Sequence, residues 1–255
     1  MRNLKITLAY DGAGFHGWQV QPQRATVQGL LAEAIARITG ESVLPQGSGR
    51  TDAGVHALGQ VASCALASPI PASGLRIALN DILPPAIRVL QVEEVDPGFH
   101  ARRCARAKTY QYRIYRGDIC PPFLARYVYH HPYPLDEQAM RCAAAGVIGE
   151  HDFTSFAAVD PERARRLNDV EDETMNVRTI FKSEWERKAD ELVYTVRGNG
   201  FLHHMVRNLV GTFLLVGKGT VSPEDVSRIL RAAERSANPG ATAPASGLYL
   251  VNVEY

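Results

Sequence analysis

The chain has 255 residues, of which 45% are hydrophobic and 22% charged, proportions that are ordinary for a soluble globular protein of one large or two modest domains. Its formal net charge of +1 excludes any argument from overall basicity, and no apolar run approaches the ~20 residues of a membrane-spanning helix. Four widely spaced cysteines without a Cys-x-x-Cys pair speak against a thiol-bound zinc. The N-terminus has no apolar signal-peptide core, so a cytoplasmic location is expected.

The first hundred residues predict a half-domain of strands and helices. Thr26 is the expected N-cap of a helix whose apolar stripe ends at Gly40, and Ser73 is the expected N-cap of a second helix that stops before Pro84. Between the first strand and the first helix lies an aromatic loop, in which Trp18 could fill a core or stack on bases, and packing is the preferred interpretation. Alternating or apolar runs predict strands at 4–10, 60–66 and 87–95.

The second half shows the same mixture of elements. Tyr110, Tyr112 and Ile114 share one face of a predicted strand, and Gly198-Asn199-Gly200 is expected to open the longest helix, with His203 and Arg207 at its flank. The stretch 160–176 is highly charged and lacks apolar periodicity, so it is expected to be a surface insertion. Further strands are predicted at 108–115, 177–186, 192–197 and 247–255, and further helices at 136–147 and from a capping box at 222–225.

A local excess of positive charge lies in the middle of the chain. Residues 99–126 contain seven Lys or Arg and a single acid, Asp118. Such a segment suits the phosphates of a nucleic acid, although a solvated basic face is the commoner explanation for a charge cluster.

The loop at 47–60 is the strongest candidate for chemistry. Glycines at 47, 49, 54 and 59 surround Asp52, and glycine permits a backbone to approach a ligand closely. Arg50 stands two residues earlier, and a nearby cation would keep a carboxylate ionised even away from water. The simpler interpretation is a turn of small residues with a surface acid.

Other reaction types lack the residues that they need. Ser48 has no nucleophile-elbow motif, and His203-His204 lacks the spacing of a zinc hydrolase. The glycine-rich loop has no P-loop lysine, and no second acid is marked out as the partner of Asp52 in a glycosidase. After these exclusions, the remaining candidate for catalysis is a single aspartate beside arginines.

The string Arg-Thr-Asp-Ala-Gly-Val-His at 50–56 resembles the catalytic loop of the TruA-type tRNA pseudouridine synthases. The resemblance continues in chain order from end to end, which is hard to reach by chance. The further segments that are similar to family motifs are Tyr10–Gln19, Phe99–Arg102, Lys108–Ile114, Asp152–Phe156, Gly200–Gly211 and Ala243–Leu250.

This resemblance implies a role for each matching residue. Asp52 is the catalytic aspartate that engages the target uridine, and Tyr110 is the tyrosine that stacks on the base and could take the C5 proton. Arg207 pairs with the aspartate, Leu248 closes the pocket, and Arg50 assists in flipping the base. Without the resemblance, Tyr110 and Leu248 would be assigned to the core, and Arg207 could equally cap its helix.

The family implies a homodimer that acts on uridines 38, 39 and 40 of the tRNA anticodon stem-loop. We expect no cofactor and no metal, because the conversion of uridine to pseudouridine is an isomerisation that consumes neither. The expected fold is α+β, with two similar α/β subdomains (1–105 and 106–255), mixed but mainly antiparallel sheets, and a central basic active-site cleft. Arg102 and Arg106 are expected to bind the RNA backbone.

Two features depart from the family pattern, and two other functions compete with the one it implies. Arg103-Cys104 replaces the usual aromatic or apolar residue and small polar one, and the charged stretch 160–176 is longer than expected. The competing functions are a catalytically silent RNA-binding protein and an aspartate-dependent nucleoside hydrolase that releases free uracil.

Overall fold

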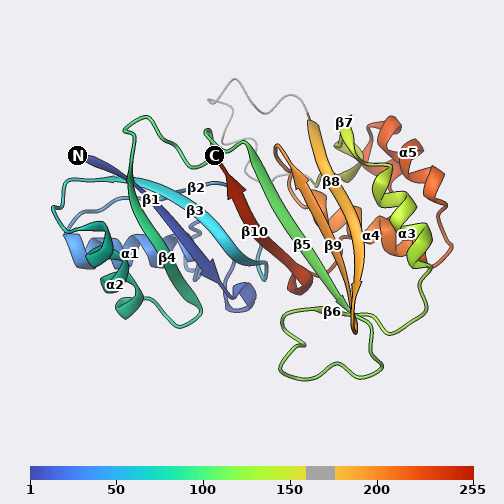
Figure 1. Cartoon of the computed structure of the whole chain (residues 1–255), viewed down its shortest axis with the longest axis horizontal. Helices are drawn as coiled ribbons and strands as arrows, with labels where there is room; N and C mark the ends of the chain where they lie inside the picture. The colour runs from blue at the N-terminus through green and yellow to red at the C-terminus, as the bar shows by residue number, and fades with distance from the viewer. Residues whose placement is uncertain (159–175) are drawn as a thin grey trace. The chain divides into compact units, whose positions relative to one another are not determined.

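The computed structural model describes residues 1–158 and 176–255 (Figure 1), so the predicted insertion lies outside the described residues except for its last one. The chain divides into two compact units, one formed by residues 1–108 with 248–255 and the other by residues 109–247. Each unit combines helices with mostly antiparallel strands, which agrees with the expected mixed fold class. Within the described part of the chain, no helix has the length and apolar character needed to cross a bilayer.

The strands of the first unit follow the order β4-β1-β3-β10. β1 is antiparallel to both β3 and β4, whereas β10 is parallel to β3, with Tyr249 opposite His56. The last strand of the chain therefore belongs to the first unit, although its position in the sequence placed it with the second half. The strands are β1 (Arg2–Tyr10), β2 (Gln46–Gly47), which pairs with β3, then β3 (His56–Leu66), β4 (Ile87–Val95) and β10 (Leu248–Glu254).

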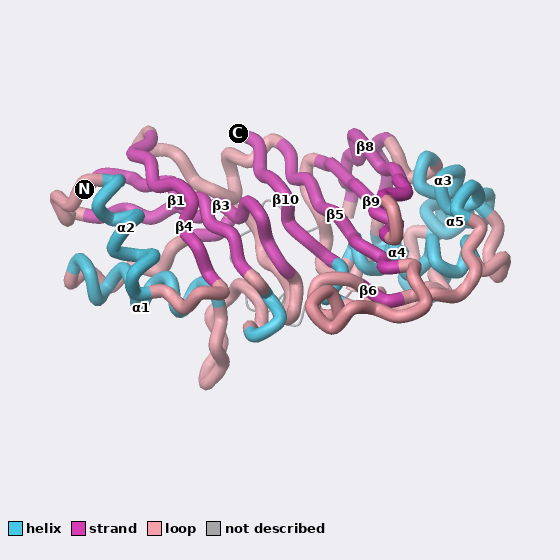
Figure 2. Tube along the Cα trace, turned by 60° about the horizontal axis from the view of Figure 1, so that its bottom comes forward, coloured by secondary structure: helices cyan, strands magenta, loops and turns pink. Residues whose placement is uncertain are grey.

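Two helices, α1 (Val27–Thr39) and α2 (Ala72–Ile82), lie together on one side of these strands (Figures 1 and 2). Thr26 caps α1 by accepting from the Gly29 N–H at 3.3 Å, and Gly40 ends it with a φ of 74°, as the sequence predicts. The expected N-cap at Ser73 is wrong. α2 begins two residues earlier, because the carbonyl of Pro71 already accepts from the Leu75 N–H at 2.9 Å.

The core of this unit follows the alternation read from the sequence. Leu4, Ile6 and Leu8 of β1 are completely buried, while the intervening Lys5 and Thr7 are partly exposed. The buried side chains of α1 and α2 complete this core; they include Val27, Leu31, Ile35, Leu75 and Leu79.

The strands of the second unit follow the order β5-β9-β8-β7, with β6 parallel to β5. The predicted hairpin is confirmed: Lys188 faces Glu191 across a two-residue turn in which Ala189 has a φ of 50°. The strands are β5 (Ala107–Tyr115), β6 (Tyr129–His130), β7 (Gly149–Asp152), β8 (Val177–Lys188) and β9 (Glu191–Gly198).

The α-helices in the described part of the second unit are α3 (Glu137–Ala145), α4 (Met205–Gly217) and α5 (Pro223–Ala232). Phe213 of α4 makes edge-to-face contacts with Trp185 of β8 and Tyr194 of β9, which fastens the helix to the hairpin. The capping box is confirmed, with Ser222 accepting from the Asp225 N–H at 3.2 Å.

Candidate active site

Asp52 lies on a loop between β2 and β3 that is bonded to the scaffold on both sides of it. The hydroxyl groups of Thr51 and Tyr10 are 2.8 Å apart, and the Thr51 carbonyl accepts from the Trp18 N–H at 3.0 Å. The Asp52 carbonyl accepts from the Val55 N–H at 3.1 Å, which closes a turn after the acid. Thr51 is buried and Asp52 half-buried, so the acid is held at the edge of the interior.

Two glycines allow the segment Tyr10–Gln19 to pack directly beneath this loop. Gly17 has a φ of 85°, and a Cβ there would lie 2.5 Å from the Thr51 carbonyl oxygen. A Cβ on Gly47 would lie 2.6 Å from the indole ring of Trp18. Trp18 itself is only 1% exposed, which confirms the interpretation of the aromatic loop as packing. The motif thus supports the Asp52 loop from below.

The hydroxyl of Tyr10 is a fixed part of this support. Burial raises the pKa of Tyr10 to about 12, against the opposite effect of its hydrogen bonds to Thr51 and Gln60. The group therefore stays protonated at neutral pH and keeps its hydrogen-bonding role.

Two basic residues are associated with the same loop: Arg50 belongs to it, and Lys108 hydrogen-bonds to it. Arg50 is exposed and donates from Nε to the Gln19 side chain at 3.3 Å. Lys108 donates from Nζ to the Ser48 carbonyl at 2.6 Å. The sequence predicted Arg50 as a site residue but counted Lys108 only within the basic segment, because nothing local links residue 108 to residue 48.

The start of β10 is fixed by a buried histidine. His56 accepts at Nδ1 from the Gly12 N–H at 3.0 Å, and its ring stacks on Tyr249 with centroids 4.8 Å apart. Leu248, the preceding residue, is 6% exposed. The same unit therefore holds both the Asp52 loop and Leu248.

The predicted RNA-binding arginines lie on and after a compact turn. The His100 ring accepts at Nδ1 from the Arg102 N–H at 3.1 Å, and the Cys104 N–H donates to the His100 carbonyl at 2.9 Å. Partial burial, together with the charge of Arg103, lowers the pKa of His100. Arg102, Arg103 and Arg106 are all exposed, so three cations project into solvent within five residues.

Tyr110 lies on β5 in the second unit. It is 7% exposed, and its ring meets Phe201 edge to face with centroids 4.9 Å apart and an interplanar angle of 76°. Tyr112 and Ile114 are buried on the same face of the strand, as the alternation predicts. The Phe201 contact fixes the ring plane of Tyr110.

Arg207 lies in the first turn of α4. The helix begins at Met205 rather than at Gly198–Gly200, because β9 continues to Gly198 and His204 adopts a φ of 59°. The prediction that His203 flanks the helix is therefore wrong. Arg207 donates from Nε to the Ala243 carbonyl at 2.7 Å, and the Ala243 N–H donates back to the Arg207 carbonyl at 3.2 Å.

A buried polar network continues from this pair. Asn208 is completely buried, donates to the Phe156 carbonyl at 2.7 Å and accepts from the Thr242 hydroxyl at 2.7 Å. Thr212 bonds to the Asn238 side chain at 2.8 Å. The start and the middle of the 238–246 loop are thereby tied to α4, which fixes the surroundings of Arg207.

The predicted residues are divided between the units. Asp52, Arg50, Leu248, Arg102 and Arg106 belong to the first, and Tyr110 and Arg207 belong to the second. Within each unit, hydrogen bonds or ring contacts hold the candidate residues that the unit contains.

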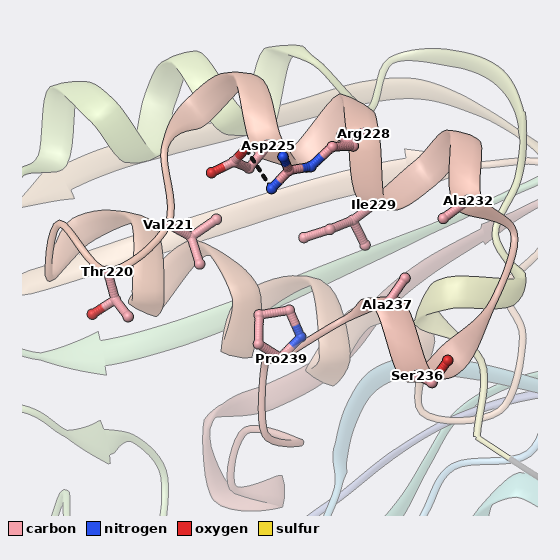
Figure 3. Close-up of a pocket in the computed structure, with 9 residues that line it drawn as sticks. All are labelled: Thr220, Val221, Asp225, Arg228, Ile229, Ala232, Ser236, Ala237 and Pro239. Carbon is pink, nitrogen blue, oxygen red and sulfur yellow. Dashed lines mark ion pairs between the residues drawn. The ribbon is translucent and has the colours of Figure 1, made fainter.

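A separate pocket of about 470 Å³ lies in the second unit (Figure 3). Val221, Ile229 and Pro239 give it apolar walls, and the ion pair of Asp225 with Arg228, 2.9 Å apart, lies at its side. None of the residues predicted for the site lines this pocket.

Comparison with known proteins gives consistent matches over the whole chain. The family model described as tRNA pseudouridine synthase matches residues 6–102 and 143–255. Proteins named tRNA pseudouridine synthase A from Solibacter usitatus and Brevibacillus brevis are 53% and 46% identical over 255 residues, with 100% of both chains covered in each case. The one from Lacticaseibacillus casei is 43% identical over 256 residues, again with full coverage. Tyr110 and Arg106 fall between the two matched segments but inside the full-length alignments.

Proposed function

Since this chain belongs to the tRNA pseudouridine synthase family, we propose that it isomerises uridine to pseudouridine at positions 38, 39 and 40 of the tRNA anticodon stem-loop. The observation that carries the proposal is the anchored loop that holds Asp52 half-buried between Thr51 and the turn at Val55. In this proposal Asp52 lies in a basic active-site cleft, and the enzyme is cytoplasmic and needs no cofactor or metal.

The reaction breaks the bond between N1 of the uracil and C1′ of the ribose and forms a bond between C5 and C1′. Asp52 engages the uridine while the freed uracil rotates, C5 loses its proton, and N1 ends protonated, so that atoms balance without a co-substrate. Tyr110 stacks on the base, and its hydroxyl oxygen takes up the C5 proton as the hydroxyl gives its own proton to solvent, from which N1 is protonated. Arg207 pairs with the Asp52 carboxylate, and Leu248 closes the pocket.

The energetics of base flipping fit these roles. Removing a base from its stack costs a few kcal/mol, and stacking on an aromatic ring returns ~1–3 kcal/mol. The edge-to-face contact with Phe201 holds the Tyr110 ring in one plane before the base arrives, which reduces the entropy lost on binding. Arg50 assists the flipping, and the exposed Arg102 and Arg106 bind phosphates next to it.

The aspartate is tested with Asp52→Asn, which keeps the shape of the side chain and removes its charge. We expect no tritium release from 5-tritiated uridine in unmodified tRNA, with tRNA affinity nearly unchanged. Asp81→Asn, an exposed acid of α2, is the control and should keep full activity. Loss of tRNA binding in step with activity would count against the assignment.

The same assay separates the competing functions. A nucleoside hydrolase releases free uracil from the wild-type reaction, whereas a silent RNA-binding protein releases no tritium at all. Tritium release without free uracil, mapped to positions 38–40 in the product tRNA, is the result that we expect.

We also propose that the enzyme is a homodimer. Ile119, Phe123 and Tyr133 are 84%, 88% and 69% exposed, an amount of apolar surface that supports burial against a partner. Phe123→Asp should shift the mass measured by light scattering from dimer to monomer, whereas Leu90→Asp, at a half-exposed position of β4, should not. A wild-type monomer would refute this part of the proposal.

A further inference from the structure

Gln60 of β3 is completely buried, and its amide group uses every hydrogen-bonding position that it has. The oxygen accepts from the Ser48 hydroxyl at 2.7 Å and from the Val61 N–H at 3.1 Å. The nitrogen donates to the Gly49 carbonyl at 3.0 Å and to the Tyr10 hydroxyl at 3.4 Å. Three of these four bonds reach residues outside its own strand.

Gln60 is connected to the Asp52 loop on both sides of Arg50, directly before it and through Tyr10 after it. Ser48 and Gly49, which bond directly to Gln60, precede Arg50. Thr51 follows Arg50 and is linked to Gln60 through Tyr10, because the hydroxyl groups of Tyr10 and Thr51 are 2.8 Å apart. One amide group therefore helps to fix the positions of residues 48, 49 and 51 relative to β1 and β3. Asp52 follows directly, and its own position depends on the backbone of Thr51.

We propose that Gln60 is a positioning residue for Asp52, an inference that rests on the proposed function. A buried amide with four partners is a rigid connection, since breaking any one bond leaves a polar atom unsatisfied away from water. A displacement of about 1 Å at a reacting group can lower the rate about 100-fold. Gln60 thus acts on the rate of the chemical step and not on tRNA binding.

A second buried glutamine provides the matched control. Gln28 of α1 is 2% exposed, donates to the Pro45 carbonyl at 2.9 Å and accepts from the Val20 N–H at 3.0 Å. It has the same chemistry as Gln60 and is also buried, but its side-chain hydrogen bonds reach Pro45 and Val20, outside residues 48–52. Gln60→Met and Gln28→Met both replace the amide by an apolar chain of similar length.

The experiment measures the single-turnover rate of pseudouridine formation per folded protein, the Kd for tRNA, and the melting temperature. We expect Gln60→Met to lower the rate about 10- to 100-fold, with the Kd for tRNA within about twofold of wild type. Gln28→Met should lower the melting temperature but leave the rate of the folded protein unchanged. A role limited to stability predicts the same unchanged rate for both variants.

The proposal is overturned if Gln60→Met keeps the wild-type rate, if only its Kd changes, or if Gln28→Met loses rate to the same degree. Should Gln60→Met fail to fold, Tyr10→Phe and Ser48→Ala each remove one connection and must lower the rate for the proposal to stand. Combining these two changes should give less than the product of their separate effects, because both act through one amide. Failure of the proposed function is visible separately, as a wild-type protein that makes no pseudouridine.

Discussion

Gly211 of α4 is the position where one added methyl group should do most damage to the second unit. A Cβ at this residue would overlap the carbonyl oxygen of Ala241 and lie 3.0 Å from its carbonyl carbon. Both are backbone atoms, so no side chain can rotate out of the way. The 238–246 loop must move away from the helix by about 1 Å or more to restore ordinary contact distances.

The cost follows from the bonds that this movement breaks. Arg207 and Ala243 exchange two hydrogen bonds, and the Thr242 hydroxyl bonds to Asn208. Each contributes about 1 kcal/mol, so about 3 kcal/mol is lost. Alanine in a helix interior returns roughly 0.5–1 kcal/mol relative to glycine. Gly211→Ala should therefore lower the free energy of unfolding by about 2 kcal/mol, or about 4–8 °C in melting temperature.

Gly74→Ala is the matched control, because Gly74 lies in α2 and a Cβ there meets only side-chain carbons at 3.6 and 3.9 Å. It should raise the free energy of unfolding by roughly 0.5–1 kcal/mol. The two variants thus have the same chemistry and opposite signs, which urea denaturation and thermal melting can measure. If Gly211→Ala proves as stable as Gly74→Ala, the contact of α4 with the 238–246 loop is not the constraint described above.

Two further predictions concern RNA binding and pH. Arg102→Ala and Arg106→Ala should each weaken tRNA binding and reduce the slope of log K against log salt concentration by about 1. The control Arg228→Ala, whose side chain is 75% exposed on α5, should change neither the affinity nor the slope. Unchanged slopes in the first two variants would exclude the phosphate contacts. Burial, aided by nearby cations, lowers the pKa of His131 from 6.5 to about 4, so its contribution to stability is complete above pH 6.5 and is lost as the pH falls towards 4. His131→Phe should make the fall in unfolding free energy over that pH range shallower than in the wild type. The same pH dependence in the variant and the wild type would contradict this prediction.

The sequence alone determined most of the local structure, because helices, strands and turns follow from periodicity and capping within a few residues. The alternation of β1, the caps of α1 and the capping box of α5 were all predictable in this way. The errors also have local causes. The start of α2 was misplaced because the Pro71 carbonyl serves the first turn, and α4 started late because β9 uses the backbone up to Gly198.

For the candidate site, the sequence supplied the groups proposed to react, and the tertiary structure decided which residues hold them. Asp52, Tyr110 and Arg207 lie in motifs that can be compared residue by residue, so their residue types and their order can be read from the sequence alone. The bonds of Gln60 to Tyr10, of Lys108 to Ser48 and of Asn208 to Thr242 join segments far apart in the chain, and no local pattern encodes such a bond. The pairing of β10 with β3 is of the same kind, because it depends on which strand edge is open after the chain has folded.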